Sequence, residues 1–226
     1  MSDYIEIMVL VEGKTEEIFV NDLLRPYMAQ KKIYLYPTQL SKPGQKGGDV
    51  RFSRAQRDIG MHLKQRLNTY VTTLIDFYGA KEWPGLDSVR SGATPAKIAQ
   101  TINEATKTEV VNLFADWRAN VRFIPYVAVH EFEAMLFSDV DLLSVKLNIN
   151  KEQVEQVLAE YGEPEAINNN PETAPSKRLD GWSVNGKFPK TTTGIVIARQ
   201  IGIPTIREKC PLFDDWLTTI ENIQRD

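Results

Sequence analysis

The chain has 226 residues, of which 42% are hydrophobic and 25% charged, with a formal net charge of −3. This size and composition are typical of a globular α/β domain with or without a helical appendage, and the acidic balance argues against a general nucleic-acid coat protein. The apolar runs are only as long as a strand, so we expect no membrane span. Cys210 is the single cysteine, so no intramolecular disulfide can form. No leader-like pattern opens the chain, and we expect a cytoplasmic protein.

The first predicted unit consists of a strand, a turn and a helix. Ile5 to Val11 is a run of β-favouring apolar residues and predicts a buried strand. The turn Glu12-Gly13-Lys14 follows, and Thr15 is the predicted N-cap of a helix whose next two residues, both glutamates, suit the helix dipole. Pro26 is expected to limit or kink that helix. A second strand is predicted from Ile33 to Leu40.

Charge is spread unevenly along the chain. The segment from Ser41 to Asn68 holds seven basic residues and two acidic ones, whereas residues 151 to 172 hold one lysine and six glutamates. Within the basic segment, a four-residue apolar repeat predicts a helix with a stripe of Ala55, Ile59, Leu63 and Leu67. The uneven charge could orient an anionic substrate, although two solvated helix faces would give the same pattern.

Two further strands complete an alternation of strands and helices. Tyr70 to Ile75 predicts the third strand, and a helix opens at Thr94-Pro95. Arg122 to Val129 predicts the fourth strand, in which Pro125 favours an edge position or a bulge. This alternation predicts an α/β fold with a mostly parallel sheet of about four strands flanked by helices.

The chain shows no convincing linker. We therefore assign residues 1–137 to the α/β core and residues 138–226 to a C-terminal helical and irregular elaboration that packs on the same core, giving one domain overall. A clear helix in that second segment is predicted from Lys151 to Tyr161.

Four acidic residues follow predicted strand ends: Glu12, Asp76, Glu131 and Glu133. The carboxyl ends of parallel strands form the ligand crevice of an open sheet, so these candidate catalytic side chains should converge. Clustered carboxylates repel one another unless a cation neutralises them, and Mg²⁺ binds one or two carboxylates together with waters and phosphate oxygens. The pattern predicts a divalent-metal site with Glu12, Asp76 and Glu133 as ligands.

Each acid also has a structural interpretation. Glu12 could cap its own turn, and Asp76 could be the N-cap of the next turn. Glu131 and Glu133 are two residues apart and would diverge on a helix, so one of them could serve the first helical turn. His130 could donate a proton in the crevice, but a structural hydrogen bond suits it better.

Basic residues near these acids predict contacts with substrate phosphates. Gly13-Lys14-Thr15 suggests a nucleotide phosphate loop, but that motif needs a glycine where Met8 lies inside the predicted strand. Lys14 is better interpreted as a point charge that meets a phosphate, or as an exposed solubilising lysine. Two basic, hydroxyl-rich turns late in the chain add Lys177, Arg178 and Lys190, with surface turns that bind nothing as the alternative.

The segment Val11-Glu12-Gly13-Lys14-Thr15-Glu16 resembles the first motif of Toprim domains, shared by topoisomerases, primases and nucleases of the overcoming-lysogenization-defect type. Five further segments together resemble the family called domain of unknown function 4276 over nearly the whole chain: Leu74-Ile75-Asp76-Phe77-Tyr78-Gly79, Phe123-Ile124-Pro125-Tyr126, His130-Glu131-Phe132-Glu133-Ala134-Met135-Leu136-Phe137, Pro175-Ser176-Lys177-Arg178 and Cys210-Pro211-Leu212-Phe213. The resemblance implies a Toprim-like fold and a role for Glu12 in metal-dependent phosphodiester chemistry. Relatives beside ATPase genes imply phage defence with an ATPase partner.

One departure from the Toprim pattern affects the metal site. Toprim domains usually carry Asp-x-Asp after the third strand, whereas this chain has Asp76-Phe77-Tyr78. Either Glu131 or Glu133 substitutes for the missing carboxylate, or the site holds a single ion, or catalysis has been lost.

The leading hypothesis is a Toprim-like nuclease that uses Mg²⁺ or Mn²⁺ to cleave DNA or RNA. Glu12 would act as general base or metal ligand, Asp76 as metal ligand, and Glu131 or Glu133 would complete the site. The alternative is a non-catalytic subunit that binds nucleic acid or an ATPase through a degenerate site. A phosphotransferase acting on nucleotides ranks third, and the sequence does not specify the oligomeric state.

Overall fold

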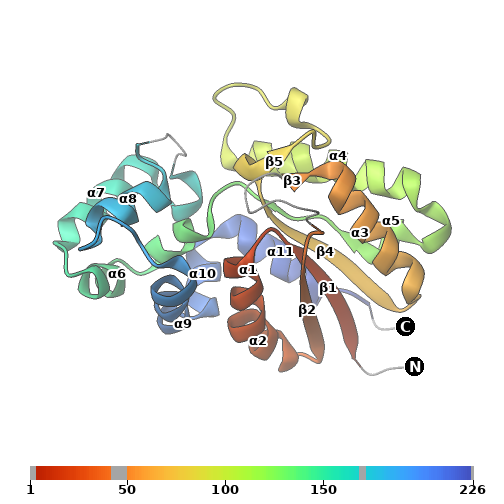
Figure 1. Ribbon diagram of the computed structural model, residues 1–226, viewed down its shortest axis with the longest axis horizontal. Helices are drawn as coiled ribbons and strands as arrows, with labels where there is room; N and C mark the ends of the chain where they lie inside the picture. Colours follow the sequence, from red (N-terminus) through yellow and green to blue (C-terminus); the bar gives the residue numbers. More distant parts are fainter. Residues whose placement is uncertain (1–3, 42–49, 168–171, 225–226) are drawn as a thin grey trace.

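The computed structural model describes residues 4–41, 50–167 and 172–224. Its central sheet has the strand order β2 (Ile33–Gln39), β1 (Ile5–Val11), β4 (Thr69–Asp76) and β6 (Phe123–Ile124), and β7 (Val127–Ala128) also pairs with β4. All these pairs are parallel (Figure 1). The predicted α/β fold with a mostly parallel sheet is confirmed.

The fourth predicted strand differs from expectation because it is broken. Arg122 ends helix α5 (Ala119–Arg122), and β6 and β7 are separated by Pro125 and Tyr126. Pro125 has no N–H for the ladder. At the break, the Thr73 hydroxyl both accepts from Tyr126 N–H and donates to Tyr126 C=O, at 3.0 Å each. Thr73 thus replaces the interrupted ladder, and the sheet has five strands rather than four.

Helices cover the two faces of the sheet. One hydrophobic cluster joins the sheet to α1 (Lys14–Phe19), η1 (Val20–Leu24), α2 (Arg25–Ala29), α10 (Ile203–Lys209) and α11 (Pro211–Glu221). A second cluster joins the other face to α3 (Phe52–Gln65), α4 (Pro95–Leu113) and α5. Ile7 and Val9 of β1 point to the first face and Leu10 to the second, as the two-residue period of a strand requires.

The structure differs from three local predictions made from the sequence. Gly13, not Thr15, is the N-cap of α1, and the Thr15 side chain is buried. The helix continues past Pro26, because the preceding segment η1 is a π-turn. In this turn the Arg25 N–H bonds to the Val20 carbonyl, five residues back instead of four. The helical hydrogen-bond pattern has therefore shifted before Pro26, which lacks an N–H donor. Leu67 does not extend the apolar stripe, because α3 ends at Gln65 and Leu67 is 66% exposed.

The Thr94 N-cap of α4 is confirmed, since its hydroxyl accepts from Lys97 N–H at 3.3 Å. The predicted helix from Lys151 to Tyr161 is also confirmed as α7. The remaining elements are η2 (Phe77–Gly79), η3 (Leu86–Ser88), η4 (Ala115–Trp117), η5 (Phe132–Ser138), α6 (Val140–Leu147), η6 (Pro164–Ala166), α8 (Pro175–Trp182), η7 (Lys190–Gly194), α9 (Ile195–Ile201) and a small parallel pair of β3 (Val50–Arg51) with β5 (Ala80–Lys81).

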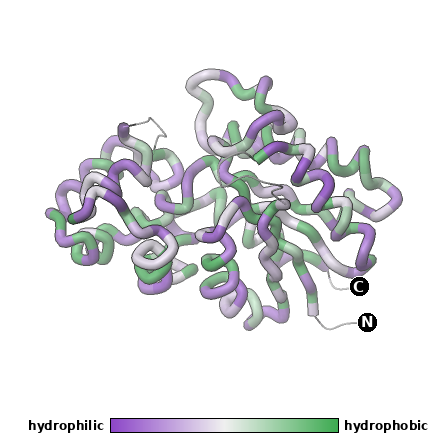
Figure 2. The backbone as a smooth tube through the Cα atoms, in the orientation of Figure 1, coloured by the Kyte–Doolittle hydropathy of each residue, from purple (hydrophilic) through white to green (hydrophobic). Residues whose placement is uncertain are grey.

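The C-terminal segment leaves the sheet and then returns to it. Helices α6 to α9 lie to one side, and hydrophilic and hydrophobic residues alternate along them (Figures 1 and 2). Helix α11 packs on the sheet, where Trp216 donates its indole N–H to the Thr72 hydroxyl of β4 at 2.9 Å. The ring of Trp216 also stacks on Tyr126, with centroids 4.6 Å apart. The boundary after residue 137 stays a prediction, but both segments contribute to one hydrophobic cluster.

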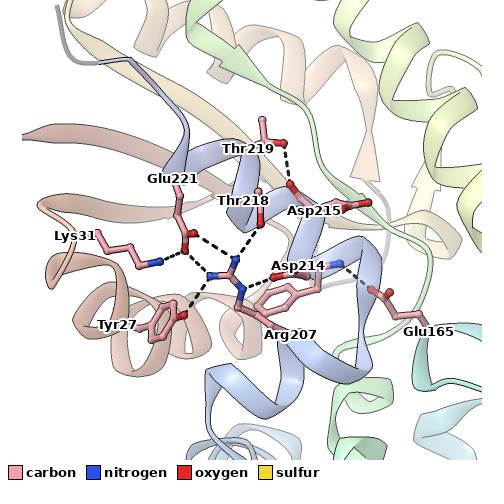
Figure 3. Close-up of polar contacts among 10 residues, drawn as sticks. Tyr27, Lys31, Glu165, Arg207, Asp214, Asp215, Thr218, Thr219 and Glu221 are labelled. Atoms are coloured by element: carbon pink, nitrogen blue, oxygen red, sulfur yellow. Dashed lines mark hydrogen bonds and ion pairs between the residues drawn. The ribbon is translucent and has the colours of Figure 1, made fainter.

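Arg207 of α10 holds this returning segment against α2 (Figure 3). Its guanidinium donates to Asp214, Glu221 and Thr218 of α11 and, at 3.2 Å, to the Tyr27 hydroxyl of α2. Within the described ranges, no helix combines the length and apolar character that crossing a membrane requires.

Candidate functional site

Glu12 lies directly after β1, at the carboxyl edge of the sheet, as predicted. Its carboxylate rests against the backbone of Gly79, which ends η2 after β4. A Cβ at position 79 would come within 2.9 Å of Glu12 Oε2 and 3.1 Å of Oε1. The chain following β4 therefore confines the Glu12 carboxylate, and a larger residue at position 79 would displace it.

Asp76 is the last residue of β4 and lies in the neighbouring position of the sheet. Its Oδ1 accepts from Tyr78 N–H at 2.8 Å, so it is also the N-cap of η2, the structural role considered for it. Burial raises the pKa of Asp76 to about 7; the bond from Tyr78 opposes that rise, and the charges of Glu12, Glu131 and Glu16 add to it. Asp76 is thus a partly buried carboxyl close to three other acids.

Glu131 follows β7 and is tied to the C-terminal segment. Its two carboxylate oxygens accept from the backbone N–H and the hydroxyl of Ser176, at 2.9 and 2.8 Å. Ser176 lies in the first turn of α8, where backbone N–H groups have no partner within the helix. Glu131 therefore caps α8 from outside while remaining close enough to Asp76 to influence the pKa of that carboxyl.

Glu133, in η5, is only 2% exposed, and its Oε1 lies 3.1 Å from Lys190 Nζ. Burial raises the pKa of Glu133, and the charge of Lys190 opposes that rise. Lys190 begins the π-turn η7 and is also close enough to Glu16 and Glu131 for their charges to raise its own pKa. The structure thus places Lys190 beside the predicted acids, although Lys190 follows Glu12 by 178 residues in the sequence.

Glu16 is the site residue that sequence reasoning missed, because we assigned it only to the helix dipole. It lies in the first turn of α1 and lines a small cavity of about 20 Å³ together with Asp76 and His130. That volume is about the space of one water molecule. The sequence did contain a signal for Glu16, namely its spacing of four residues from Glu12. Four residues are about one helical turn, so a side chain at this position lies near the strand end from which the helix starts.

His130 also lines this cavity, and it is 7% exposed. Its Nε2 is buried and has no hydrogen-bond partner among the described residues, and burial lowers the pKa of His130 to about 3. Burial thus favours the neutral imidazole, which is a weak proton donor, so the structure does not support His130 as a general acid. The structural hydrogen bond expected for His130 is not found at Nε2.

Of the other predicted phosphate-binding residues, Lys14 and Arg178 have partners outside these acids. Lys14 is exposed and pairs with Glu17 at 3.0 Å. Arg178 donates to the Thr173 carbonyl at 2.7 Å and lies over the ring of Tyr161, 5.7 Å from its centroid. Lys177 is exposed on α8. The segment around Lys177 is a helix rather than the predicted turn, because Pro175 takes the first helical position.

We refer to Glu12, Glu16, Asp76, Glu131 and Glu133 as the acidic cluster. Its members come from the carboxyl ends of β1 and β4 and from the chain after β7, with Lys190 added from η7. Over the described parts of the chain, the acidic and histidine side chains do not form a closed group of three or more that encloses a metal ion. The cluster is an association of mutually repelling acids with one nearby cation.

Comparisons with known proteins give two matches of different kinds. A family model described as "Domain of unknown function (DUF4276)" matches residues 11–221. Among solved structures, the C-terminal region of the Xanthomonas campestris pv. campestris OLD protein aligns with a TM-score of 0.39 and 13% sequence identity, covering 98% of this chain and all of that one. No curated protein matches the sequence.

Proposed function

Because the chain belongs to the family described as domain of unknown function DUF4276, its activity has to be inferred from the site, and we propose that the acidic cluster binds Mg²⁺ or Mn²⁺ and hydrolyses phosphodiester bonds of DNA or RNA. The protein would be a Toprim-like nuclease, in phage defence working with an ATPase. The family description assigns no reaction, so the proposal rests on the chemistry of the side chains.

The observation that carries the proposal is the environment of Asp76. This carboxyl is partly buried near Glu12, Glu16 and Glu131, and burial together with their charges raises its pKa. Acids placed this way destabilise one another in the ionised state, and a divalent cation removes that repulsion. Perturbed carboxyls gathered at the carboxyl edge of a parallel sheet are typical of functional sites.

The chemistry of the donors suits a hard cation, but the described side chains do not converge on one ion position, so binding would require them to move. Glu12, Asp76 and Glu133 supply carboxylate oxygens, which Mg²⁺ and Mn²⁺ prefer, and Glu16 adds another next to Asp76. When bound, such an ion polarises the phosphate and lowers the pKa of a coordinated water. Glu131 would position the site through Ser176, and Lys190 would stabilise negative charge on the phosphate that approaches Glu133.

The test is cleavage of labelled DNA and RNA with and without Mn²⁺. Glu12→Gln and Asp76→Asn keep the shape of the side chains but remove their charge, and each should abolish cleavage. Glu152→Gln, an exposed acid on α7, is the matched control and should cleave like the wild type. Full activity in both site variants would refute the proposal.

Thermal melting tests ion binding separately from catalysis. An ion that binds only the folded protein raises the melting temperature as its concentration increases. Mn²⁺ should therefore stabilise the wild type, and Asp76→Asn should reduce that stabilisation. A melting temperature independent of Mn²⁺ in the wild type would remove the metal from the proposal.

A second candidate function is a non-catalytic subunit that binds nucleic acid or an ATPase. Two observations favour it: Asp76 and Glu131 both serve as caps for neighbouring helices, and the acids do not enclose an ion-sized site among the described residues. The two functions differ in one measurement. A subunit would show no cleavage of any nucleic acid with Mn²⁺, even when the partner ATPase is added.

A further inference from the structure

Among the described residues, the sheet face on the α3 side is only partly covered where β1 and β2 lie. Along β1 and β2, buried residues alternate with half-buried ones. Ile7 and Leu35 point to the α1 side and are fully buried, whereas Met8 and Tyr36 point the other way and are only partly buried. Because β2 is an edge strand of the sheet and Tyr36 is only partly buried, part of the tyrosine ring is available to a ligand.

Two neighbouring hollows lie over this half-face. The first has a volume of about 430 Å³ and is lined by Met8 and Tyr36 from the strands and by His62 and Gln65 from α3. The second, about 490 Å³, is lined by Tyr4 and others, and both hollows share Glu6, Arg66 and Thr69. The first, which we call the Tyr36 hollow, falls within the size range of small-molecule sites.

The wall of the hollow formed by the end of α3 is held in place by a buried arginine. Arg122 is 2% exposed, and its guanidinium donates to the carbonyls of Leu63, Arg66 and Thr69. These bonds fix the chain where α3 ends and β4 begins. The hollow is therefore a preformed feature of the fold rather than a gap between loose side chains.

The lining combines a flat apolar surface with unsatisfied hydrogen-bonding capacity. Tyr36 supplies an aromatic ring, and the Arg25 guanidinium lies over it, 5.1 Å from the centroid. Met8 adds a polarisable side chain beside it. The Nε2 atom of His62 is buried behind this lining and has no hydrogen-bond partner among the described residues, and the exposed Gln65 can both donate and accept.

We propose that the Tyr36 hollow binds a nucleobase, which stacks on Tyr36 and is held at its edge by Glu6, His62 and Gln65. A planar heteroaromatic ring with donors and acceptors at its rim satisfies both kinds of lining, and stacking on an exposed sheet face is a common way to bind bases. Arg66 pairs with Glu6 at 3.4 Å, and because its side chain is 73% exposed it can also meet the attached phosphate.

This site is separate from the acidic cluster. Glu6 lies near the start of β1 and Glu12 follows its end, so about 20 Å of extended strand lies between them. A single strand of a few nucleotides spans that length. The base could belong to such a strand or to a free nucleotide, and the experiment below distinguishes the two.

Binding is measured by fluorescence anisotropy with a labelled ten-residue oligodeoxyadenylate and an abasic oligonucleotide of the same length. EDTA is present throughout, so cleavage does not interfere and failure of the proposed nuclease activity leaves this measurement unaffected. The wild type should bind the adenine oligonucleotide roughly 5- to 100-fold more tightly than the abasic one, from stacking of one base. Calorimetry with AMP and ribose 5-phosphate repeats the comparison for free nucleotides.

Three variants locate the effect. Tyr36→Ala should bring the two affinities to near equality, while Tyr36→Phe should keep the preference because the ring remains. Gln65→Trp fills the hollow from an exposed position and should also remove the preference for the adenine oligonucleotide. This variant keeps the proposal testable if Tyr36→Ala fails to fold. AMP bound in preference to ribose 5-phosphate indicates a free-nucleotide site, and preference confined to the oligonucleotides indicates a strand.

Two results would overturn the proposal. One is equal binding of adenine and abasic ligands by the wild type. The other is a preference that Tyr36→Ala and Gln65→Trp both leave unchanged. If Tyr36→Ala instead converts a dimer to a monomer in sedimentation, with no effect on base preference, the half-face is a contact between two copies of the chain.

Discussion

Lys190 Nζ lies 3.1 Å from Glu133 Oε1, and through this contact the C-terminal segment neutralises a nearly buried acid at the carboxyl edge of the sheet. The lysine side chain is about half exposed, whereas the glutamate is not. The ion pair therefore joins two segments that are remote in sequence and adds one positive charge to the acidic cluster.

Lys190→Met should destabilise the fold, because it leaves the Glu133 charge buried without a partner. We expect a loss of about 1–3 kcal/mol in the free energy of unfolding at pH 8. Burial raises the pKa of Glu133, and removing Lys190 raises it further, so the acid is more readily protonated in the folded variant. The loss should therefore be smaller at pH 5, as measured by urea unfolding at both values.

The control is Lys190→Arg, which keeps the positive charge and should stay within about 1 kcal/mol of the wild type. An equal loss at pH 5 and pH 8 in Lys190→Met would contradict the charge-based explanation and point to lost packing instead.

Gly79→Ala should displace the Glu12 carboxylate without unfolding the protein. The added Cβ would lie 2.9 Å from Oε2, at the flexible end of the Glu12 side chain, so that side chain can move away. We expect a change of less than about 1 kcal/mol in stability but at least a tenfold loss of Mn²⁺-dependent cleavage. Gly181→Ala, where a Cβ meets nothing within 4 Å, is the matched control.

Comparable cleavage by Gly79→Ala and Gly181→Ala would show that the position of the Glu12 carboxylate does not matter for the reaction. Thermal melting of both variants, measured alongside, separates an effect on the site from an effect on folding.

Arg207→Met should lower the free energy of unfolding by about 1–3 kcal/mol, because it leaves the Asp214 carboxylate without its cation and leaves Glu221 paired with Lys31 alone (Figure 3). Arg199→Met removes an exposed arginine whose pair with Asp22 is also exposed, and should cost less than about 1 kcal/mol. Urea unfolding checks both, and equal losses would mean that the Arg207 network does not stabilise the returning segment.

Glu165 should make stability depend on pH. Burial raises its pKa to about 7, despite the N–H groups of Leu212 and Phe213 that it accepts from at the start of α11. Between about pH 5 and 8, the unfolded chain loses the proton that the folded protein keeps, so stability falls as the pH rises.

Comparison with Glu165→Gln isolates the contribution of Glu165, because the glutamine amide does not titrate. The contributions of all other titrating groups are the same in both proteins and cancel in the difference. The free energy of unfolding of the wild type, relative to the variant, should decrease by about 1–3 kcal/mol from pH 5 to pH 8. A constant difference over that range would mean that the pKa of Glu165 is not raised.

Local patterns in the sequence were sufficient to locate most of the sheet. Ile5–Val11 was predicted with its observed bounds, since a short apolar run fits only a buried strand, and Thr94-Pro95 marked the start of α4 through cap chemistry alone. The strand-end acids Glu12 and Asp76 followed from the same reasoning, because the carboxyl edge of a parallel sheet is fixed once its strands are known.

Other features of the fold depend on tertiary packing and cannot be predicted from local sequence patterns. The split between β6 and β7 depends on Thr73, and the π-turn before Pro26 depends on how that helix packs, so neither was visible in residue periodicity. Sequence alone determined which acids stand at strand ends. Only the folded chain determined that Glu16 joins them, that Ser176 holds Glu131 and that Lys190 meets Glu133, because those contacts are set by side-chain positions in three dimensions and not by spacing along the chain.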